Sequence, residues 1–360
     1  MRKQTKIIIL FALSFIFLLF VFNDHFLYKK PIMKINEIEE KIEVEGKEKH
    51  ITQYIKGKIK NGKYKGKIYG VINNTTSSGV YDEQIHKNSE LFVEIKGNKV
   101  VGISGIKRDK YIAILFIIFI NSLLLVSGRK GVKTLVSLFV NIAISFVAIF
   151  LFQKHARTWN MLILYLFVSA LFVTISLYIT NGKHKKTLAS ILSSIASFII
   201  SFSLAFIIIK LYKKPIPYWT LDYIEAVHDY ENFFYVTILL SGLGAIMDIS
   251  ITIASSLSEI IEKNPNIKRH NLIKSGKEIC KDIIGTMNNV MLFTCYTSII
   301  PMTFLLMKNN IVIGNAISLY GQIELIVVLT SCISIVLAIP ISLYISSLVL
   351  HPRNRGDIND

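Results

Sequence analysis

The sequence predicts an α-helical polytopic membrane protein with about eight transmembrane helices and a small β-rich extracytoplasmic domain. Of its 360 residues, 52% are hydrophobic, and the mean hydropathy is +0.50. The apolar residues are grouped in blocks of about 20, the length that crosses a roughly 30 Å hydrocarbon core as a helix. One polar stretch interrupts the series. We therefore expect an N-terminal membrane anchor helix at 1–27, the β-rich domain at 28–110 and a seven-helix membrane domain at 111–360.

Eight apolar blocks supply the expected spans, and they begin near Ile7, Tyr111, Val132, Trp159, Leu188, Phe233, Ile283 and Ile323. The first block follows three basic residues and has the length of a signal peptide. The segment VFNDHFLYKK that follows it contains no small-residue cleavage site, so we expect an uncleaved anchor.

The basic residues are distributed as the positive-inside rule requires if both termini are cytoplasmic. The formal net charge is +17, and on this topology the short inside segments carry 17 Lys and Arg against 6 on the short outside segments. The other 18 lie between Tyr28 and Lys110, beside 11 acidic residues and without an aromatic stacking pattern. This charge suits a lipid bilayer surface and not nucleic acid. The abundance of Ile, Lys and Asn favours a bacterial cytoplasmic membrane.

The polar stretch contains two hairpin signals. ITQYIKGKIK and KYKGKIYGVIN alternate around Asn61-Gly62, and LFVEI and VVGIS flank Gly97-Asn98. They predict four to six strands, preceded by a charge-dense segment, INEIEEKIEVEGKEK, that we expect to be a short helix or a stalk. The domain either caps the bundle and helps it assemble, or acts as a gate or partner-docking module.

Composition argues against cofactors, metals and catalysis. The three cysteines, Cys280, Cys295 and Cys332, lie in or beside spans and have no metal-ligand spacing. All eight histidines map outside the spans or at their edges, and the sequence has neither an H-E-x-x-H motif nor a phosphate-binding Gly-rich loop. We expect no cofactor, no metal and no enzyme activity.

The sixth and seventh expected spans carry polar residues at helical spacing. In the sixth, an acidic residue stands in the apolar run FFYVTILLSGLGAIMDISITIAS, and the small and polar residues that share its face are Ser241, Gly244, Asp248, Thr252, Ser255 and Glu259. In the seventh, the corresponding residues are Asp282, Gly285, Thr286, Asn288 and Asn289. We expect Gly244 and Gly285 to serve helix packing.

The two stripes lie at similar depth. At about 1.5 Å per residue, Asp248 is roughly 6 to 12 Å and Asn289 about 9 Å from the cytoplasmic boundary. An Asn amide can donate to a carboxylate, and Thr252 and Thr286 can add hydroxyls. The sequence therefore predicts a polar pocket between these spans, of the kind that a cation or a transferred proton needs.

The same residues resemble a known family. GAIMDISITIASSLSEI, the loop NPNIKRHNLIKSGKEI and the following KDIIGTMNN are similar to the YibE/F family of bacterial multispan membrane proteins. On this resemblance Asp248, Asp282, Gly285, Thr286 and Asn289 occupy family positions, while Lys281 replaces an Arg and Asn288 a Thr. The resemblance also agrees with an exported β-rich domain before seven spans, and it implies no activity.

Three functions remain open. In the first, the chain is a transporter or channel component that moves an ion or small solute along the polar pocket, since ionisable residues within a membrane are functional by default. Alternatively, Asp248 and Asn289 only lock two helices, and the chain is a non-catalytic scaffold or assembly protein whose exported domain binds a protein partner. An intramembrane aspartyl enzyme needs two adjacent carboxylates, and Asp282 lies a turn or two nearer the cytoplasm than Asp248.

Overall fold

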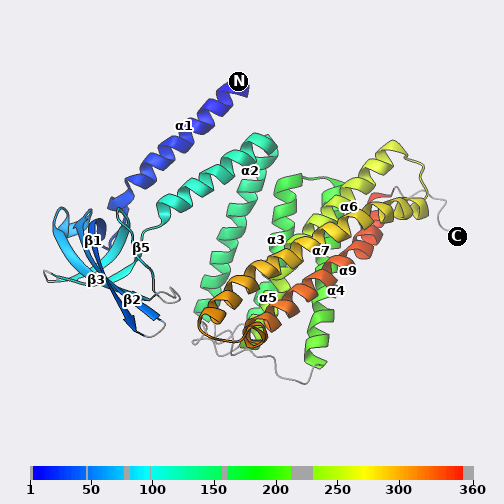
Figure 1. The fold of residues 1–360 in the computed structure, drawn as a ribbon. Coiled ribbons are helices and arrows are strands. Elements are labelled where there is room, and N and C mark those ends of the chain that lie inside the picture. Colours follow the sequence, from blue (N-terminus) through cyan, green and yellow to red (C-terminus); the bar gives the residue numbers. More distant parts are fainter. Residues whose placement is uncertain are drawn as a thin grey trace. The chain divides into compact units, whose positions relative to one another are not determined.

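The chain forms two units, an N-terminal one that ends at Gly131 and a C-terminal one that begins at Val132. The computed structural model describes residues 3–45, 48–76, 82–97, 99–155, 160–211 and 230–351. Figure 1 shows a small sheet in the first unit and long helices in the second. The first unit also contains the apolar helix at 3–22 and the apolar segment that begins at 109.

The N-terminal unit holds a five-stranded antiparallel sheet in the order β3-β2-β1-β4-β5. Its strands are β1 (Ile32–Glu45), β2 (Glu48–Ile59), β3 (Ile68–Thr76), β4 (Glu90–Lys96) and β5 (Lys99–Ile106). Short 3₁₀ turns lie at η1 (Asp24–Leu27) and η2 (Gly62–Tyr64). The sheet curls around one apolar core, and the central side chains of that core are Met33, Ile35, Ile55, Ile59, Leu91 and Val93.

Both hairpins expected from the sequence are confirmed, with one difference in their turns. Gly97 has φ 63, as a tight β4–β5 turn requires. The β2–β3 connection spans residues 60–67, longer than a two-residue turn, and the Asn61 side chain is buried within it. Its Oδ1 accepts a hydrogen bond from the Ile32 amide at 2.7 Å, and its Nδ2 donates to the Tyr28 carbonyl at 2.8 Å. Asn61 thereby ties the turn to the start of β1.

The expectation of a helix or stalk at INEIEEKIEVEGKEK is wrong. Residues 32–45 form β1, whose partners in β2 run from Met33 opposite Ile59 to Glu45 opposite Glu48. Charged side chains concealed the alternation of Ile38, Ile42 and Val44 with Glu and Lys. Long-range pairing with β2 decides the outcome, as is usual for strand propensity.

Among the described residues, the apolar helices are fewer and longer than the eight expected. Six are long and apolar enough to cross a membrane, counting the α5–α6 pair as one, and a shorter apolar helix covers Ile8–Phe22. The helices are α1 (Lys3–Phe22), α2 (Asp109–His155), α3 (Met161–Asn181), α4 (Lys185–Leu211), α5 (Tyr230–Ser241), α6 (Leu243–Lys263), α7 (Arg269–Lys308), α8 (Ile313–Ala316) and α9 (Gln322–Leu350). A π-helical turn, η4 (Ile317–Gly321), leads into α9.

Two of the expected spans fall within α2. Its 47 residues measure about 70 Å, more than twice the hydrocarbon thickness. Gly128 breaks the helix with φ 52 and ψ −122, and three basic residues lie within the next five positions, namely Arg129, Lys130 and Lys133. A glycine adopts this conformation without the steric penalty of a Cβ atom. The break coincides with the expected boundary between the second and third apolar blocks.

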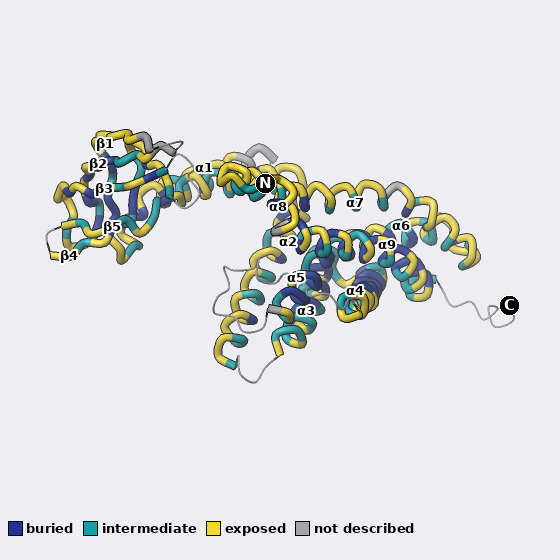
Figure 2. Tube along the Cα trace, turned by 60° about the horizontal axis from the view of Figure 1, so that its bottom comes forward, coloured by how far each residue is buried: buried dark blue, intermediate teal, exposed yellow. Residues whose placement is uncertain are grey.

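The core of the C-terminal unit lies where α4, α6 and α9 meet. Figure 2 shows buried positions gathered on these helices, whereas α7 is exposed along most of its length. In the most apolar 18-residue segment of α7, 6% of the residues are buried. In the corresponding segment of α5–α6, 50% are buried. Helix α7 contributes Leu272 and Cys280 to the core and packs against α9, but much of its outer half is exposed on the single chain.

Candidate functional site

Helix α6 has two faces of opposite character. Ile246, Ile249, Ile253 and Leu257 lie one helical turn apart and are at most 2% exposed, so they form the face that packs against α4 and α9. Asp248 lies about half a turn from this ridge and is exposed. The periodicity that buries the isoleucines therefore directs the carboxylate away from the core of its own chain.

The outer face of α6 carries the other residues that the sequence singled out. Gly244, Thr252 and Glu259 are exposed together with Asp248, whereas Ser241 and Ser255 are half-buried at the edge of the face. A Cβ atom added to Gly244 would meet nothing within 4 Å, so no described helix packs against it within one chain. The expected small-residue contact at Gly244 is not formed by the described part of this chain.

The Asp248 carboxylate has no hydrogen bond or ion pair with any described residue. The Thr252 hydroxyl donates to the Asp248 backbone carbonyl at 2.7 Å, which leaves the carboxylate oxygens untouched. The expected bond from Asn289 is not among those that the described residues form. The structure thus brings Asp248 and Thr252 together on one face but does not pair Asp248 with α7.

Helix α7 also carries exposed small and polar residues on its outer face. Gly285, Thr286 and Asn289 are exposed, and Asn288 is half-buried. The Asn288 Oδ1 atom is buried and lacks a hydrogen-bond partner among the described residues. The Asp282 side chain lies outside the described residues. Like Asp248, Asn288 carries a polar atom at membrane depth that the described chain leaves unsatisfied.

The sequence reading missed a set of serines that lies in the core of the unit. The serines buried on α4 are Ser190, Ser193, Ser194, Ser197 and Ser201, and those on α9 are Ser331, Ser334, Ser342, Ser346 and Ser347. Their spacing of three or four, visible in LASILSSIASFIISFS, is the signal that could have revealed them. Small residues at such spacing let helix backbones approach closely in a membrane.

Hydrogen bonds between helices run through this serine cluster. The Ser250 and Ser342 hydroxyls are 2.9 Å apart, joining α6 to α9, and those of Ser241 and Ser331 are 2.7 Å apart. The Ser190 hydroxyl lies 3.4 Å from the Ser250 carbonyl oxygen, which joins α4 to α6. The serines therefore fix the three central helices against one another.

One small cavity lies within the described part of this core. A cavity bounded by Ser201, Gly242 and Ser334 has a volume of about 10 Å³, which is room for one water molecule. A hydrated ion needs far more. The serine cluster is accordingly a packed seam, whereas the outer faces of α6 and α7 carry polar residues with free surface.

No group of three or more metal-ligating side chains occurs among the described residues. Cys280 and Cys295 are buried and unpaired, and Cys332 is half-buried. Each of the three lies on α7 or α9, and Cys280 belongs to the apolar core.

Long apolar helices, a serine-packed core and an outward-facing carboxylate define this chain as a multispan membrane protein. It belongs to the YibE/F family: the family model described as YibE/F-like protein matches residues 115–352. A second model, the YibE/F family N-terminal domain, matches residues 26–106, which contain the five-stranded sheet. The resemblance of the stretch around Asp248 to this family is confirmed. Neither the curated proteins nor the solved structures include a match to the chain.

Proposed function

We propose that this chain is a component of a membrane transporter or channel, and that its polar route follows the outer face of α6 beside the inner half of α7. The observation that carries the proposal is the position of Asp248. It lies in an apolar helix, is exposed on the single chain, and has no partner among the described residues.

Energetics support this reading. An ionised side chain at the centre of a bilayer costs about 2.5 to 3.5 kcal/mol on the insertion scale, so lipid is a poor neighbour for the carboxylate. Gly244 and Thr252 extend the polar surface by one turn on each side, about 6 Å in each direction. Water or a second subunit must cover this strip, and a water-filled strip with a carboxylate attracts a cation or a proton.

The topology that suits this route has eight crossings. They are α1, the two halves of α2, α3, α4, α5–α6, α7 and α9. The proposed site is the bacterial cytoplasmic membrane, with both termini in the cytoplasm and the sheet outside. The basic residues after the α2 break and those from Lys263 to Lys281, around the α6–α7 connection, support this orientation. In this proposal the chain moves an ion or small solute and catalyses no reaction.

One observation favours a second candidate, a non-catalytic scaffold. The core is packed with serines, the buried Asn288 Oδ1 atom has no partner among the described residues, and the exposed Asp248 carboxylate forms no bond with them. Asn and Asp side chains can join helices of different chains. On this reading the outer face binds another membrane subunit and the exported sheet binds a protein partner.

Flux measurements on reconstituted protein separate the two candidates. Wild type, Asp248→Asn and Glu262→Gln are purified, checked for folding by thermal unfolding in detergent, and sealed into liposomes. Proton and cation fluxes are then recorded under a panel of gradients. Glu262→Gln is the matched control, because Glu262 is an exposed carboxylate near the end of the same helix.

The transport proposal expects flux in wild type and Glu262→Gln and its loss in folded Asp248→Asn. Equal flux from all three variants contradicts a role for Asp248 in the route. No flux from any variant, combined with a lower oligomeric state of Asp248→Asn on detergent gels, supports the scaffold instead.

A further inference from the structure

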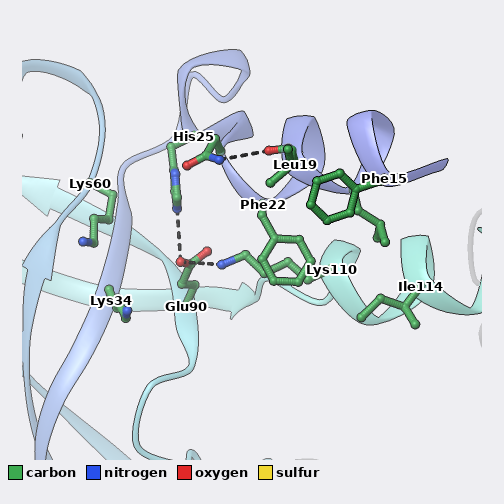
Figure 3. A pocket seen from close by; sticks show the side chains of 11 residues that line it. Phe15, Leu19, Phe22, His25, Lys34, Lys60, Glu90, Lys110 and Ile114 are labelled. Carbon is green, nitrogen blue, oxygen red and sulfur yellow. Dashed lines mark hydrogen bonds and ion pairs between the residues drawn. The ribbon is translucent and has the colours of Figure 1, made fainter. Parts of the chain in front are cut away.

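A cavity of about 600 Å³ lies in the N-terminal unit, where the end of α1, the sheet and the start of α2 come together (Figure 3). Its two sides differ in chemistry. Phe15, Leu19 and Phe22 of α1 and Ile114 of α2 supply an apolar side. Figure 3 shows Lys34 and Lys60 on the other side, towards the strands. The cavity therefore suits a molecule with one charged and one apolar end.

Lys34 and Lys60 are half-buried and form no ion pair with a described carboxylate. Lys34 lies on β1 directly opposite Glu90 of β4, so both side chains leave the sheet on the same face. Lys60 follows β2, and its backbone amide donates to the Ile32 carbonyl at 2.8 Å, which holds it beside the start of β1. Two ammonium groups lining one cavity favour an anion between them.

Glu90 favours a bound molecule that can donate a hydrogen bond. Its side chain is 6% exposed, and its Oε1 accepts hydrogen bonds from His25 Nε2 at 3.1 Å and Lys110 Nζ at 2.7 Å. Its Oε2 is buried with no partner among the described residues. A buried carboxylate oxygen without a donor is costly, so a bound molecule that donates to it would be stabilised.

Glu90 is ionised at neutral pH. Burial alone raises the pKa of a carboxyl group, but the hydrogen bonds and charges of Lys110 and His25 outweigh it and hold the pKa of Glu90 below its ordinary value. The Oε2 atom is consequently an acceptor only, and it requires a hydroxyl or an N–H group from the ligand.

The apolar side has the composition of a segment at the edge of the hydrocarbon. The Ser14 hydroxyl donates to Asn121 Oδ1 at 3.0 Å, and Lys110 lies over the Phe22 ring at 5.5 Å, so α1 and the start of α2 run side by side in opposite directions. From Phe15 to Phe22 the apolar side extends about 10 Å along α1. Aromatic rings and snorkelling lysines of this kind occur at the interface between acyl chains and head groups.

We propose that this cavity binds one membrane phospholipid, with its phosphate between Lys34 and Lys60, a head-group hydroxyl or ammonium on Glu90 Oε2, and its acyl chains along α1 and α2. Such a lipid would hold the sheet at a fixed height above the bilayer. The proposal is independent of transport through the α6–α7 face. It predicts preference for glycerol or ethanolamine head groups over choline, because a quaternary ammonium has no N–H to donate.

The test uses the full-length protein in one detergent and short-chain dihexanoyl lipids. Binding of phosphatidylglycerol, phosphatidylethanolamine and phosphatidylcholine is measured by native mass spectrometry, with inorganic phosphate and glycerol phosphate as competitors. The variants are Lys34→Gln/Lys60→Gln and the control Lys96→Gln/Lys99→Gln, which removes two exposed charges from the β4–β5 turn of the same sheet. Thermal unfolding confirms that each variant is folded.

We expect removal of the lysine pair in the cavity to weaken lipid binding, and removal of the control pair to leave it unchanged. At about 1 kcal/mol per lysine, the double variant binds phosphatidylglycerol roughly thirty-fold more weakly than wild type. The control variant binds like wild type, and phosphatidylcholine binds wild type more weakly than the other two lipids. Free phosphate fails to displace the lipid at equal concentration.

Several results overturn the proposal. One is equal binding by wild type and a folded Lys34→Gln/Lys60→Gln protein, and another is an equal loss in the control. Equal affinity for the three head groups in wild type removes the role of Glu90 without depending on any variant. Displacement by inorganic phosphate at the lipid's own concentration would make the cavity a site for free phosphate and not for a lipid.

Discussion

Removing the Lys107 ammonium should strongly destabilise the N-terminal unit. The Lys107 side chain is 1% exposed, and its Nζ donates to Asp24 Oδ1 at 2.6 Å and to Asp109 Oδ2. It also lies 5.0 Å from the centre of the Tyr28 ring. These contacts join the segment after α1 to the segment before α2. In Lys107→Met the Asp24 carboxylate, itself 7% exposed, remains buried without its counter-charge.

The expected loss follows from that geometry. Breaking one partner of a buried ion pair costs about 3 to 5 kcal/mol, because the remaining charge stays desolvated. The matched control is Arg108→Met, which removes the next basic residue along the chain. Arg108 pairs with Glu83, but both side chains are more than half exposed, so we expect a loss below about 1 kcal/mol.

Hydrogen–deuterium exchange of the full chain in detergent measures the effect locally, on the amides of β1 and β4. A loss of about 3 to 5 kcal/mol accelerates their exchange by roughly two to four orders of magnitude in Lys107→Met. Exchange in Arg108→Met should stay within about tenfold of wild type. Equal rates in Lys107→Met and wild type would refute the reasoning, since they would mean that the buried pair contributes nothing to the unit.

The same cluster predicts a dependence on pH. Burial lowers the pKa of Lys107, but the hydrogen bonds and charges of Asp109 and Asp24 outweigh it and raise the pKa above its ordinary value of 10.5. The ammonium therefore stabilises the fold fully below that ordinary value, and its contribution is lost as the pH rises through the higher pKa of the folded state. Lys107→Met should remove this alkaline loss of protection.

Two further substitutions test the packing of each unit. Gly57→Ala should destabilise the sheet by about 1 to 3 kcal/mol, because its Cβ would lie 2.6 Å from a backbone oxygen and a methionine side chain of β1. Gly70→Ala is the control, since its Cβ would meet nothing closer than 3.8 Å, and thermal unfolding should show little change in it. A double-mutant cycle of Ser250→Ala and Ser342→Ala, measured by unfolding in detergent, should give a coupling of about 0.6 kcal/mol through the hydroxyl contact of 2.9 Å. Exact additivity of the two serine substitutions would show that the hydroxyls do not interact.

The sequence predicted the elements with strong local signals. Glycine turns located both hairpins, and blocks of about 20 apolar residues located the membrane helices. It failed where long-range contacts decide. The acidic segment of β1 becomes a strand only because β2 pairs with it along 12 residues. By contrast, the break at Gly128 divides α2 into two helical halves at the boundary that the sequence placed between the second and third spans.

The candidate site shows a second kind of limit. Periodicity correctly placed Asp248 and Thr252 on one face of a helix, but it could not decide which face turns inwards. That depends on the partners: the serine-rich faces of α4 and α9 accept the isoleucine ridge of α6. The serines were overlooked because each one alone is unremarkable in a membrane helix, and their common face appears only when spacing is followed along the whole helix.

The most direct test of the account is the water accessibility of the α6 face. Single cysteines at Gly244, Asp248 and Thr252, and at the exposed apolar position Phe293 of α7 as a control, are reacted in sealed membrane vesicles with a water-soluble thiol reagent. The native cysteines of the parent protein give the baseline. The account predicts labelling at the three α6 positions and none above baseline at Phe293. Absence of labelling at all three α6 positions in folded variants would contradict it and make Asp248 a residue that joins this chain to a partner.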